Sequence, residues 1–200
     1  MRMRIAGGLL LVLACAAAPV FAQMADRAEA IVSNKCFICH GLLGESSSRQ
    51  YPKLAAQHAQ YIAKQLDDFK TGRRKSDTMR AMASELTAEE MVALGQYFEK
   101  QASPAVPHAD SAIAEAGRSL FLHGNPARNV PACASCHGEK GHGTPLLPRL
   151  AGQRPAYLEN QLRLFTQRER TNDNAVMHDI AANLKDDDVV ALAIFLGSAD

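Results

Sequence analysis

The chain has 200 residues and a formal net charge of +1, with 22 lysines and arginines against 21 aspartates and glutamates. This near-neutral balance gives no support for nucleic-acid binding, which needs a basic surface to match the phosphates. Hydrophobic residues make up 47% of the chain, which is enough to build one medium-sized domain or two small ones.

The chain begins with a basic segment, Met1 to Arg4, which is followed by an apolar run from Ile5 to about Ala22. The end of this run offers small residues at the positions that signal peptidase reads. We therefore predict a signal peptide over residues 1–22, cleaved after Ala22, and export to the periplasm. Two alternatives remain: an uncleaved anchor, since about 18 mostly apolar residues could just span a bilayer, and a lipoprotein acylated at Cys15.

Two Cys-x-x-Cys-His motifs follow, at residues 36–40 and 133–137. This spacing is the attachment pattern of c-type haem. The two thiols of such a motif add to the two vinyl groups of a haem, and the adjacent histidine ligates the iron. Removal of Cys15 with the signal peptide would leave every cysteine in these motifs. We therefore predict two covalently bound haem c groups, attached through Cys36, Cys39, Cys133 and Cys136, with His40 and His137 as axial ligands.

The segments after the two motifs repeat each other. Residues 52–57 match residues 148–153, and the pattern Tyr-x-x-x-Gln-Leu-x-x-Phe that begins at Tyr61 returns at Tyr157. Two prolines lie between the copies, in the segment from Ser103 to His108, and indicate a linker. The repeat predicts a first domain over residues 23–103, a linker over 104–109 and a second domain over 110–200.

Both copies carry helical patterns and no convincing alternating strand. In the first copy, apolar residues recur at helical spacing from Ile62 to Phe69, and Gly72 follows where a glycine would end the helix. Thr87 to Glu90 form a capping box that opens a second helix. The corresponding helix of the second copy begins with Asp186 to Asp188, where the helix dipole favours negative charge. We predict an all-α fold in which a buried haem completes each small core.

Methionines further along each copy are the candidates for the sixth iron ligand, since methionine fills this position opposite histidine in cytochromes c. Met79 and Met177 align in the repeat and follow their motif histidines at nearly the same distance. We predict that these two residues are the ligands. Met82 is the alternative in the first copy, and His178 could compete with Met177.

Together these motifs resemble a known family. CxxCHG, then P-x-L-A-(G/A)-Q, then Y-(I/L)-x-x-Q-L-x-x-F and a methionine before a final helix are similar to class I cytochrome c. Two such modules behind a signal peptide resemble the di-haem cytochrome c4 family. The resemblance implies that the carbonyls of Pro52 and Pro148 accept hydrogen bonds from the axial histidines. The first copy departs from the pattern at Gly44 to Ser48, where the second copy has the glycine-rich segment from Gly141 to Thr144.

The resemblance further implies an electron carrier rather than an enzyme, moving single electrons between Fe(III) and Fe(II). Its partners would be redox proteins, with electrons passing from a quinol-oxidising complex toward a terminal oxidase and with peripheral membrane association left open. The alternative is an electron-accepting cytochrome subunit of a periplasmic dehydrogenase. Zinc or dithiol chemistry is a third class, but the two cysteine pairs are 97 residues apart and lack a βαβ context. The basic cluster from Lys70 to Lys75 is either a solvated face or a docking site for an acidic partner.

Overall fold

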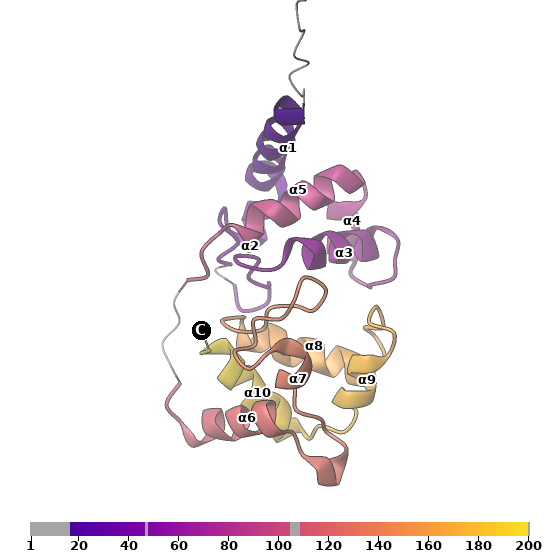
Figure 1. Ribbon diagram of the computed structural model, residues 1–200. Helices are drawn as coiled ribbons and strands as arrows, with labels where there is room; N and C mark the ends of the chain where they lie inside the picture. The colour runs from indigo at the N-terminus through magenta and orange to yellow at the C-terminus, as the bar shows by residue number, and fades with distance from the viewer. Residues whose placement is uncertain (1–16, 47, 105–108, 200) are drawn as a thin grey trace, which may run out of the picture.

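The computed structural model describes residues 17–46, 48–104 and 109–199, without the side chains of residues 17–21. Most of the predicted signal peptide, residues 1–16, and the linker positions 105–108 lie outside these ranges. Within them the chain is helical and forms no strand, only isolated β-bridges. Figure 1 shows two helical halves, one above the other, with loops of both halves meeting between them.

The two halves contain similar series of helices. The N-terminal half contains α1 (Ala17–Ile31), a π-helical turn (Val32–Cys36), α2 (Phe37–His40), α3 (Ala59–Lys70), α4 (Asp77–Ala83) and α5 (Ala88–Glu99). The C-terminal half contains α6 (Ala112–His123), a 3-10 turn (Pro126–Arg128), α7 (Ala134–His137), α8 (Pro155–Thr166), α9 (Val176–Ala181) and α10 (Asp186–Gly197). The cysteine–histidine motifs end in the very short helices α2 and α7.

The last long helix organises the packing of each half. In the N-terminal half α5 packs against α1 and α3, and in the C-terminal half α10 packs against α6 and α8. Two glycines inside helices permit close crossings, although glycine weakens a helix interior. A side-chain carbon at Gly95 would collide with the backbone carbonyl of Ala59, and one at Gly117 with that of Ala191. The crossings therefore depend on the missing side chains.

The predicted helix ends are confirmed. The Thr87 hydroxyl accepts from the Glu90 N–H at 3.2 Å, and the Glu90 carboxylate accepts from the Thr87 N–H at 2.9 Å, which completes the capping box of α5. At α10 the Asp188 carboxylate accepts from the Lys185 N–H at 2.8 Å. Gly72 follows the end of α3 with φ of +78°, a conformation that favours glycine.

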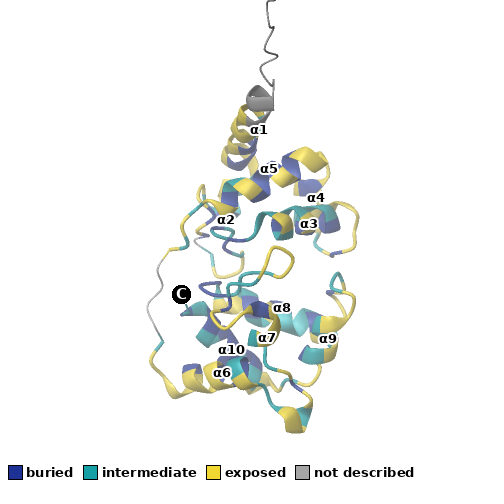
Figure 2. Cartoon of the chain, viewed as in Figure 1, coloured by how far each residue is buried: buried dark blue, intermediate teal, exposed yellow. Residues whose placement is uncertain are grey.

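Each half has its own apolar core, seen as buried segments of the helices in Figure 2. Phe98 and Leu94 lie at the centre of the first core, and Phe121 and Leu192 at the centre of the second. Helix α1 passes through the predicted cleavage position at Ala22. Among its described side chains, those of residues 22–31, the buried ones are Ala28 and Ile31, which come later. Among the described residues, no helix combines the length and the apolar character that crossing a membrane requires.

Candidate haem-attachment sites

The two motifs adopt the same local structure. In each, one turn of helix carries the second cysteine and ends on the histidine, and a glycine with positive φ turns the chain away: Gly41 at +78° and Gly138 at +77°. Cysteines three positions apart on such a turn lie on one face of the helix. The motif therefore presents two thiols and an imidazole from a single short segment, as haem attachment requires.

The motif histidines are buried and held by proline carbonyls. The Nδ1 atom of His40 lies 2.9 Å from the Pro52 oxygen, and that of His137 lies 3.2 Å from the Pro148 oxygen. Because a carbonyl can only accept, Nδ1 carries the proton and Nε2 keeps a free lone pair. Burial lowers the pKa of both histidines, although the proline hydrogen bonds oppose this. The lowered pKa favours the neutral ring, the form in which histidine binds a metal, here through Nε2.

None of the four motif cysteines is paired in a disulfide. Burial raises the pKa of Cys36 and of Cys133 to about 11. A thiol–disulfide site needs a cysteine whose pKa is lowered, so that a thiolate forms near neutral pH. These thiols have the opposite property, and within the described residues no three His, Cys, Asp or Glu side chains group as a metal site. The raised pKa disfavours the dithiol interpretation, whereas the donor set of two thiols and one imidazole fits haem c.

The candidate methionines occupy matching places on the short helices α4 and α9. The backbone N–H of Met79 donates to the Ser76 hydroxyl at 3.3 Å, and that of Met177 donates to the Asp173 carboxylate at 2.5 Å. Met79 is half-buried against the first core, whereas Met82 is exposed. Met177 is also half-buried.

His178 lies next to Met177 and is half-buried. Its Nδ1 atom lies 2.8 Å from the Phe165 carbonyl oxygen at the end of α8, so the ring is tied to this helix by one nitrogen. This contact leaves Nε2 free, as at His40 and His137, so the choice of Met177 over His178 rests on the repeat, in which Met177 aligns with Met79.

The loops after the motifs are more alike than their sequences suggest. The N–H of Ser46 donates to the His40 carbonyl at 2.8 Å, and that of Gly143 donates to the His137 carbonyl at the same distance. Ser46 adopts φ of +45°, and its buried hydroxyl donates to the Tyr51 carbonyl at 2.9 Å. The departure from the glycine-rich pattern in the first copy therefore leaves this part of the loop backbone unchanged.

Comparison with known proteins gives consistent matches. A family model described as cytochrome c matches residues 25–102 and again residues 114–200. Cytochrome c4 from Thiocapsa roseopersicina is 41% identical over 188 residues, which cover 90% of this chain and 95% of that protein. The crystal structure of reduced recombinant cytochrome c4 from Pseudomonas stutzeri matches with a TM-score of 0.82 at 34% identity, covering 88% of this chain and 98% of that one.

The chain belongs to the cytochrome c4 family. Its fold is two tandem, all-α cytochrome c domains, and it carries two haem c groups as an electron carrier rather than an enzyme. Another relative, named thiosulfate dehydrogenase electron acceptor, comes from Stutzerimonas stutzeri (strain A1501). It is 38% identical over 169 residues, which cover 82% of this chain and 78% of that protein.

Two arginines of this chain lie in the contact between its two domains. Arg74 and Arg170 form an antiparallel bridge, and both are buried. Each guanidinium covers an aromatic ring of its own domain, Phe69 at 4.6 Å and Phe165 at 4.5 Å from the ring centroid. Both arginines donate hydrogen bonds to glutamine and tyrosine oxygens on the two domains: Gln65, Gln161, Tyr61 and Tyr157.

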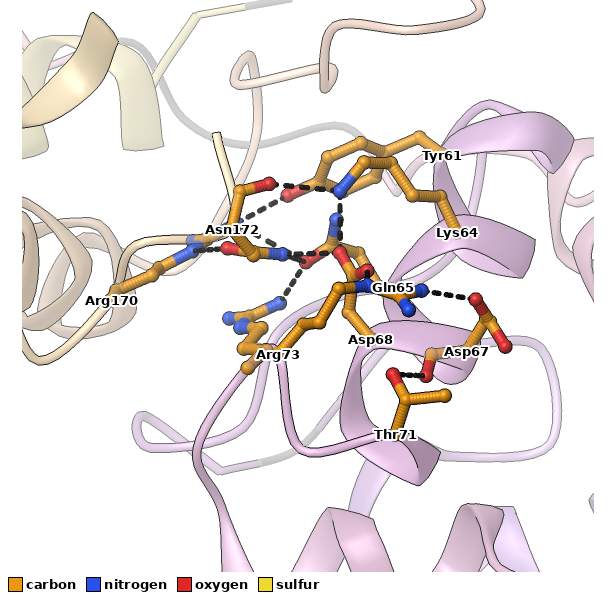
Figure 3. A network of polar contacts seen from close by, with 10 residues as sticks. Tyr61, Lys64, Gln65, Asp67, Asp68, Thr71, Arg73, Arg170 and Asn172 are labelled. Atoms are coloured by element: carbon orange, nitrogen blue, oxygen red, sulfur yellow. Dashed lines mark hydrogen bonds and ion pairs between the residues drawn. The ribbon is translucent and has the colours of Figure 1, made fainter. Parts of the chain in front are cut away.

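A charged cluster beside these arginines breaks the symmetry (Figure 3). The Asp68 carboxylate is almost fully buried and accepts from Lys64 at 2.5 Å, Arg73 at 2.8 Å and Asn172 at 2.6 Å. Burial alone would raise the pKa of Asp68, but these hydrogen bonds outweigh it and lower the pKa. The repeat places Leu164 opposite Asp68, so the second domain lacks this carboxylate.

The basic cluster from Lys70 to Lys75 is exposed except at Arg74, and its basic side chains also pair within the protein. Arg74 is buried between the domains, and Arg73 pairs with Asp67 and Asp68. Lys70 donates to the Leu86 carbonyl at 2.6 Å, and Lys75 pairs with Glu169 of the second domain at 3.0 Å. The cluster is used within and between the domains, which a one-dimensional charge pattern does not reveal.

Sequence reasoning also missed two glutamines. Gln57 and Gln153 end the matched P-x-L-A-(G/A)-Q segments, and each is buried against the backbone of the other domain. Their matched positions in the repeat were the available signal. The repeat alone could not show that their contacts cross from one domain to the other.

Proposed function

We propose that this protein is a periplasmic di-haem cytochrome that relays single electrons with His/Met ligation at both irons. His40 and Met79 would ligate the first iron, and His137 and Met177 the second. Thioether bonds would form at Cys36, Cys39, Cys133 and Cys136. The bound haem supplies the redox chemistry, a one-electron change between Fe(III) and Fe(II). The chain's own task is to hold this group, orient its axial ligands and exclude water from it.

The observation that carries the proposal is the state of the two buried histidines. Each ring is buried and hydrogen-bonded through Nδ1 to the carbonyl of Pro52 or Pro148, at 2.9 and 3.2 Å. A fixed ring presents Nε2 in one direction, which is the usual arrangement for a metal-binding histidine. The adjacent cysteines lie on the same turn. A histidine ring that is held in place should move little between Fe(III) and Fe(II), which suits a site for electron transfer.

The methionine assignments rest on burial and on the repeat. Met79 packs against the first core from α4, whereas Met82 lies one turn further along the helix and is exposed. Met177 occupies the matching short helix α9, and its neighbour His178 is held by the Phe165 carbonyl. A thioether ligand on both irons would close their sixth positions, which favours electron transfer over substrate chemistry.

For the mature chain we propose residues 23–103 and 110–200 as the two domains, joined by a linker over 104–109. Cleavage after Ala22 would keep the part of α1 that contributes to the core, because Ala28 and Ile31 lie beyond the cleavage site. Haem c is attached outside the cytoplasmic membrane, so export and the cysteine motifs support one another.

For the partners we propose a quinol-oxidising complex as donor and a terminal oxidase as acceptor. The alternative donor is a periplasmic dehydrogenase, and the 38% identical relative named thiosulfate dehydrogenase electron acceptor supports it. Stopped-flow reduction by the two donors separates these routes. Fast reduction by the dehydrogenase and none by the quinol-oxidising complex would favour the alternative.

The mass of the exported holoprotein tests the proposal. We expect the mass of residues 23–200 plus two haems, with an absorption spectrum of six-coordinate, low-spin iron. Cys15→Ser is the matched control, because a residue inside the signal peptide should change neither the mature mass nor the haem content. A mass with fewer than two haems would contradict the attachment sites, and an acylated product would support the lipoprotein alternative.

A further inference from the structure

Each domain holds one backbone residue of the other domain with a buried glutamine side chain. Gln153 accepts from the Lys53 N–H at 2.7 Å and donates to the Lys53 carbonyl at 3.0 Å. Gln57 accepts from the Arg149 N–H at 2.8 Å and donates to the Arg149 carbonyl at 3.0 Å. Both amides therefore pair with the donor and the acceptor of a single residue, as a neighbouring β-strand would.

The residues that are held come directly after Pro52 and Pro148. The Lys53 N–H and the Pro52 carbonyl belong to one peptide group, which is planar and conjugated. This peptide group therefore accepts a hydrogen bond from His40 at one end and donates one to Gln153 at the other. This series of hydrogen bonds runs from His40 Nδ1–H to the Pro52 oxygen, and from the Lys53 N–H to Gln153 Oε1.

The second domain has the equivalent series of hydrogen bonds, which begins at its own histidine and ends at a glutamine of the first domain. His137 donates to the Pro148 oxygen at 3.2 Å, and the Arg149 N–H donates to the Gln57 Oε1 at 2.8 Å. The glutamine of each domain thus ends the hydrogen-bond chain that begins at the histidine of the other domain. Gln57 and Gln153 are both buried, so water does not replace them readily.

We propose that Gln57 and Gln153 are cross-domain positioning residues, each of which tunes the haem of the opposite domain through its proline peptide. Hydrogen bonds in series polarise one another, so an acceptor on the peptide N–H makes the peptide carbonyl a stronger acceptor. A stronger bond at Nδ1 makes the histidine a better donor to iron and favours Fe(III). The proposal rests on the proposed function, because His40 and His137 must be iron ligands.

The competing explanation is that the glutamines only join the domains. Loosening the contact would then expose both haem sites to water alike, and either substitution would affect both haems. If each glutamine instead tunes a haem through the proline peptide, each substitution should affect only the haem of the opposite domain, which is a crossed pattern. Changing Gln153, in the second domain, affects the haem of the first, and changing Gln57 affects the haem of the second.

The test uses the holoprotein with either Gln153→Leu or Gln57→Leu, and each variant is the control for the other. Leucine is close to glutamine in size but has no hydrogen-bonding group. The haem methyl signals of each domain are followed by NMR through a redox titration. We expect Gln153→Leu to raise the reduction potential of the first haem and to leave that of the second nearly unchanged. Gln57→Leu should do the reverse. Equal shifts of both haems, or no shift, would overturn the proposal.

A second readout covers variants that mature poorly. In the reduced protein with ¹⁵N-labelled histidine, the Nδ1–H signal of His40 should move in Gln153→Glu and stay in place in Gln57→Glu. Glutamate keeps the acceptor oxygen and adds charge, so the shift should indicate a stronger hydrogen bond. A shift in both variants, or in neither, would reject the crossed pattern. Failure of the proposed function would differ, since the unsubstituted protein would then lack a His/Met spectrum.

Discussion

The two domains agree where the motif histidine is held and differ on the surface beside it. Both histidines are tied to a proline carbonyl, and both loops repeat the same backbone hydrogen bond. The outward positions of the first motif region are large, apolar and exposed, whereas the matching positions of the second are small or charged. The first set is Phe37, Ile38, Leu42 and Leu43, and the second is Ala134, Ser135, Glu139 and Lys140. The domains therefore share the hydrogen bonds around the motif histidine and differ in the surface beside it.

The buried charge at the interface is a second difference. Asp68 places a carboxylate on the side of the first domain, and Leu164 occupies the matched position in the second. Arg74 and Arg170, by contrast, are equivalent in burial and in their ring contacts. The interface is therefore close to symmetric in these two arginines and their glutamine and tyrosine partners, and asymmetric at Asp68.

Replacing the candidate ligands should have the largest effect, and it tests whether the domains share one ligand set. Met79→Ala and Met177→Ala should each remove one Fe–S(Met) absorption band in the red region, because each opens one sixth position. Haem should stay covalently bound. Met82→Ala is the matched control on α4 and should leave the spectrum unchanged, since Met82 is exposed. Loss of the first band in Met82→Ala instead would transfer the ligand role to that residue.

Asp68→Leu makes the first domain resemble the second and should have an intermediate effect. It removes the acceptor of Lys64, Arg73 and Asn172 and should lower the free energy of unfolding by about 1–3 kcal/mol. Denaturant unfolding of the holoproteins at neutral pH measures the difference. Equal stability of the two proteins would show that the cluster contributes nothing net.

The difference in stability between the original protein and Asp68→Leu should depend on pH. Because the folded-state pKa of Asp68 is lowered, its stabilising contribution is complete above the unfolded value of about 3.9 and is lost as the pH falls through the folded value. The difference between the original protein and Asp68→Leu should therefore shrink below about pH 4. A constant difference across this range would mean that the carboxylate's ionisation is not involved.

The helix caps should give the smallest effect and again distinguish the domains. Thr87→Ala removes the side-chain half of the α5 capping box and should cost about 0.5–2 kcal/mol. Lys185→Ala, at the matched start of α10, should change stability by less than about 0.5 kcal/mol, because the cap there uses the Asp188 side chain and the Lys185 backbone. Thermal unfolding of the two variants makes the comparison.

Local patterns in the sequence predicted α3, α5 and α10, because caps and helical periodicity act over a few residues. Motif spacing likewise named the candidate haem-binding residues. The burial of Arg74 within the basic cluster could not be predicted, since it depends on contacts with Tyr157 and Gln161 in the other domain. Gln57 and Gln153 were visible as matched residues, but their partners lie far away along the chain. Contacts between copies of a repeat leave no local pattern.

The crossed glutamines have a consequence for how the two copies of this repeat can evolve. A change at Gln153 alters the surroundings of His40, and a change at Gln57 alters those of His137. Under the proposed tuning the two copies are therefore coupled at these positions, and separating them would remove a buried hydrogen-bond partner from each. Under this proposal the duplicated modules act as an interdependent pair rather than as two separate units.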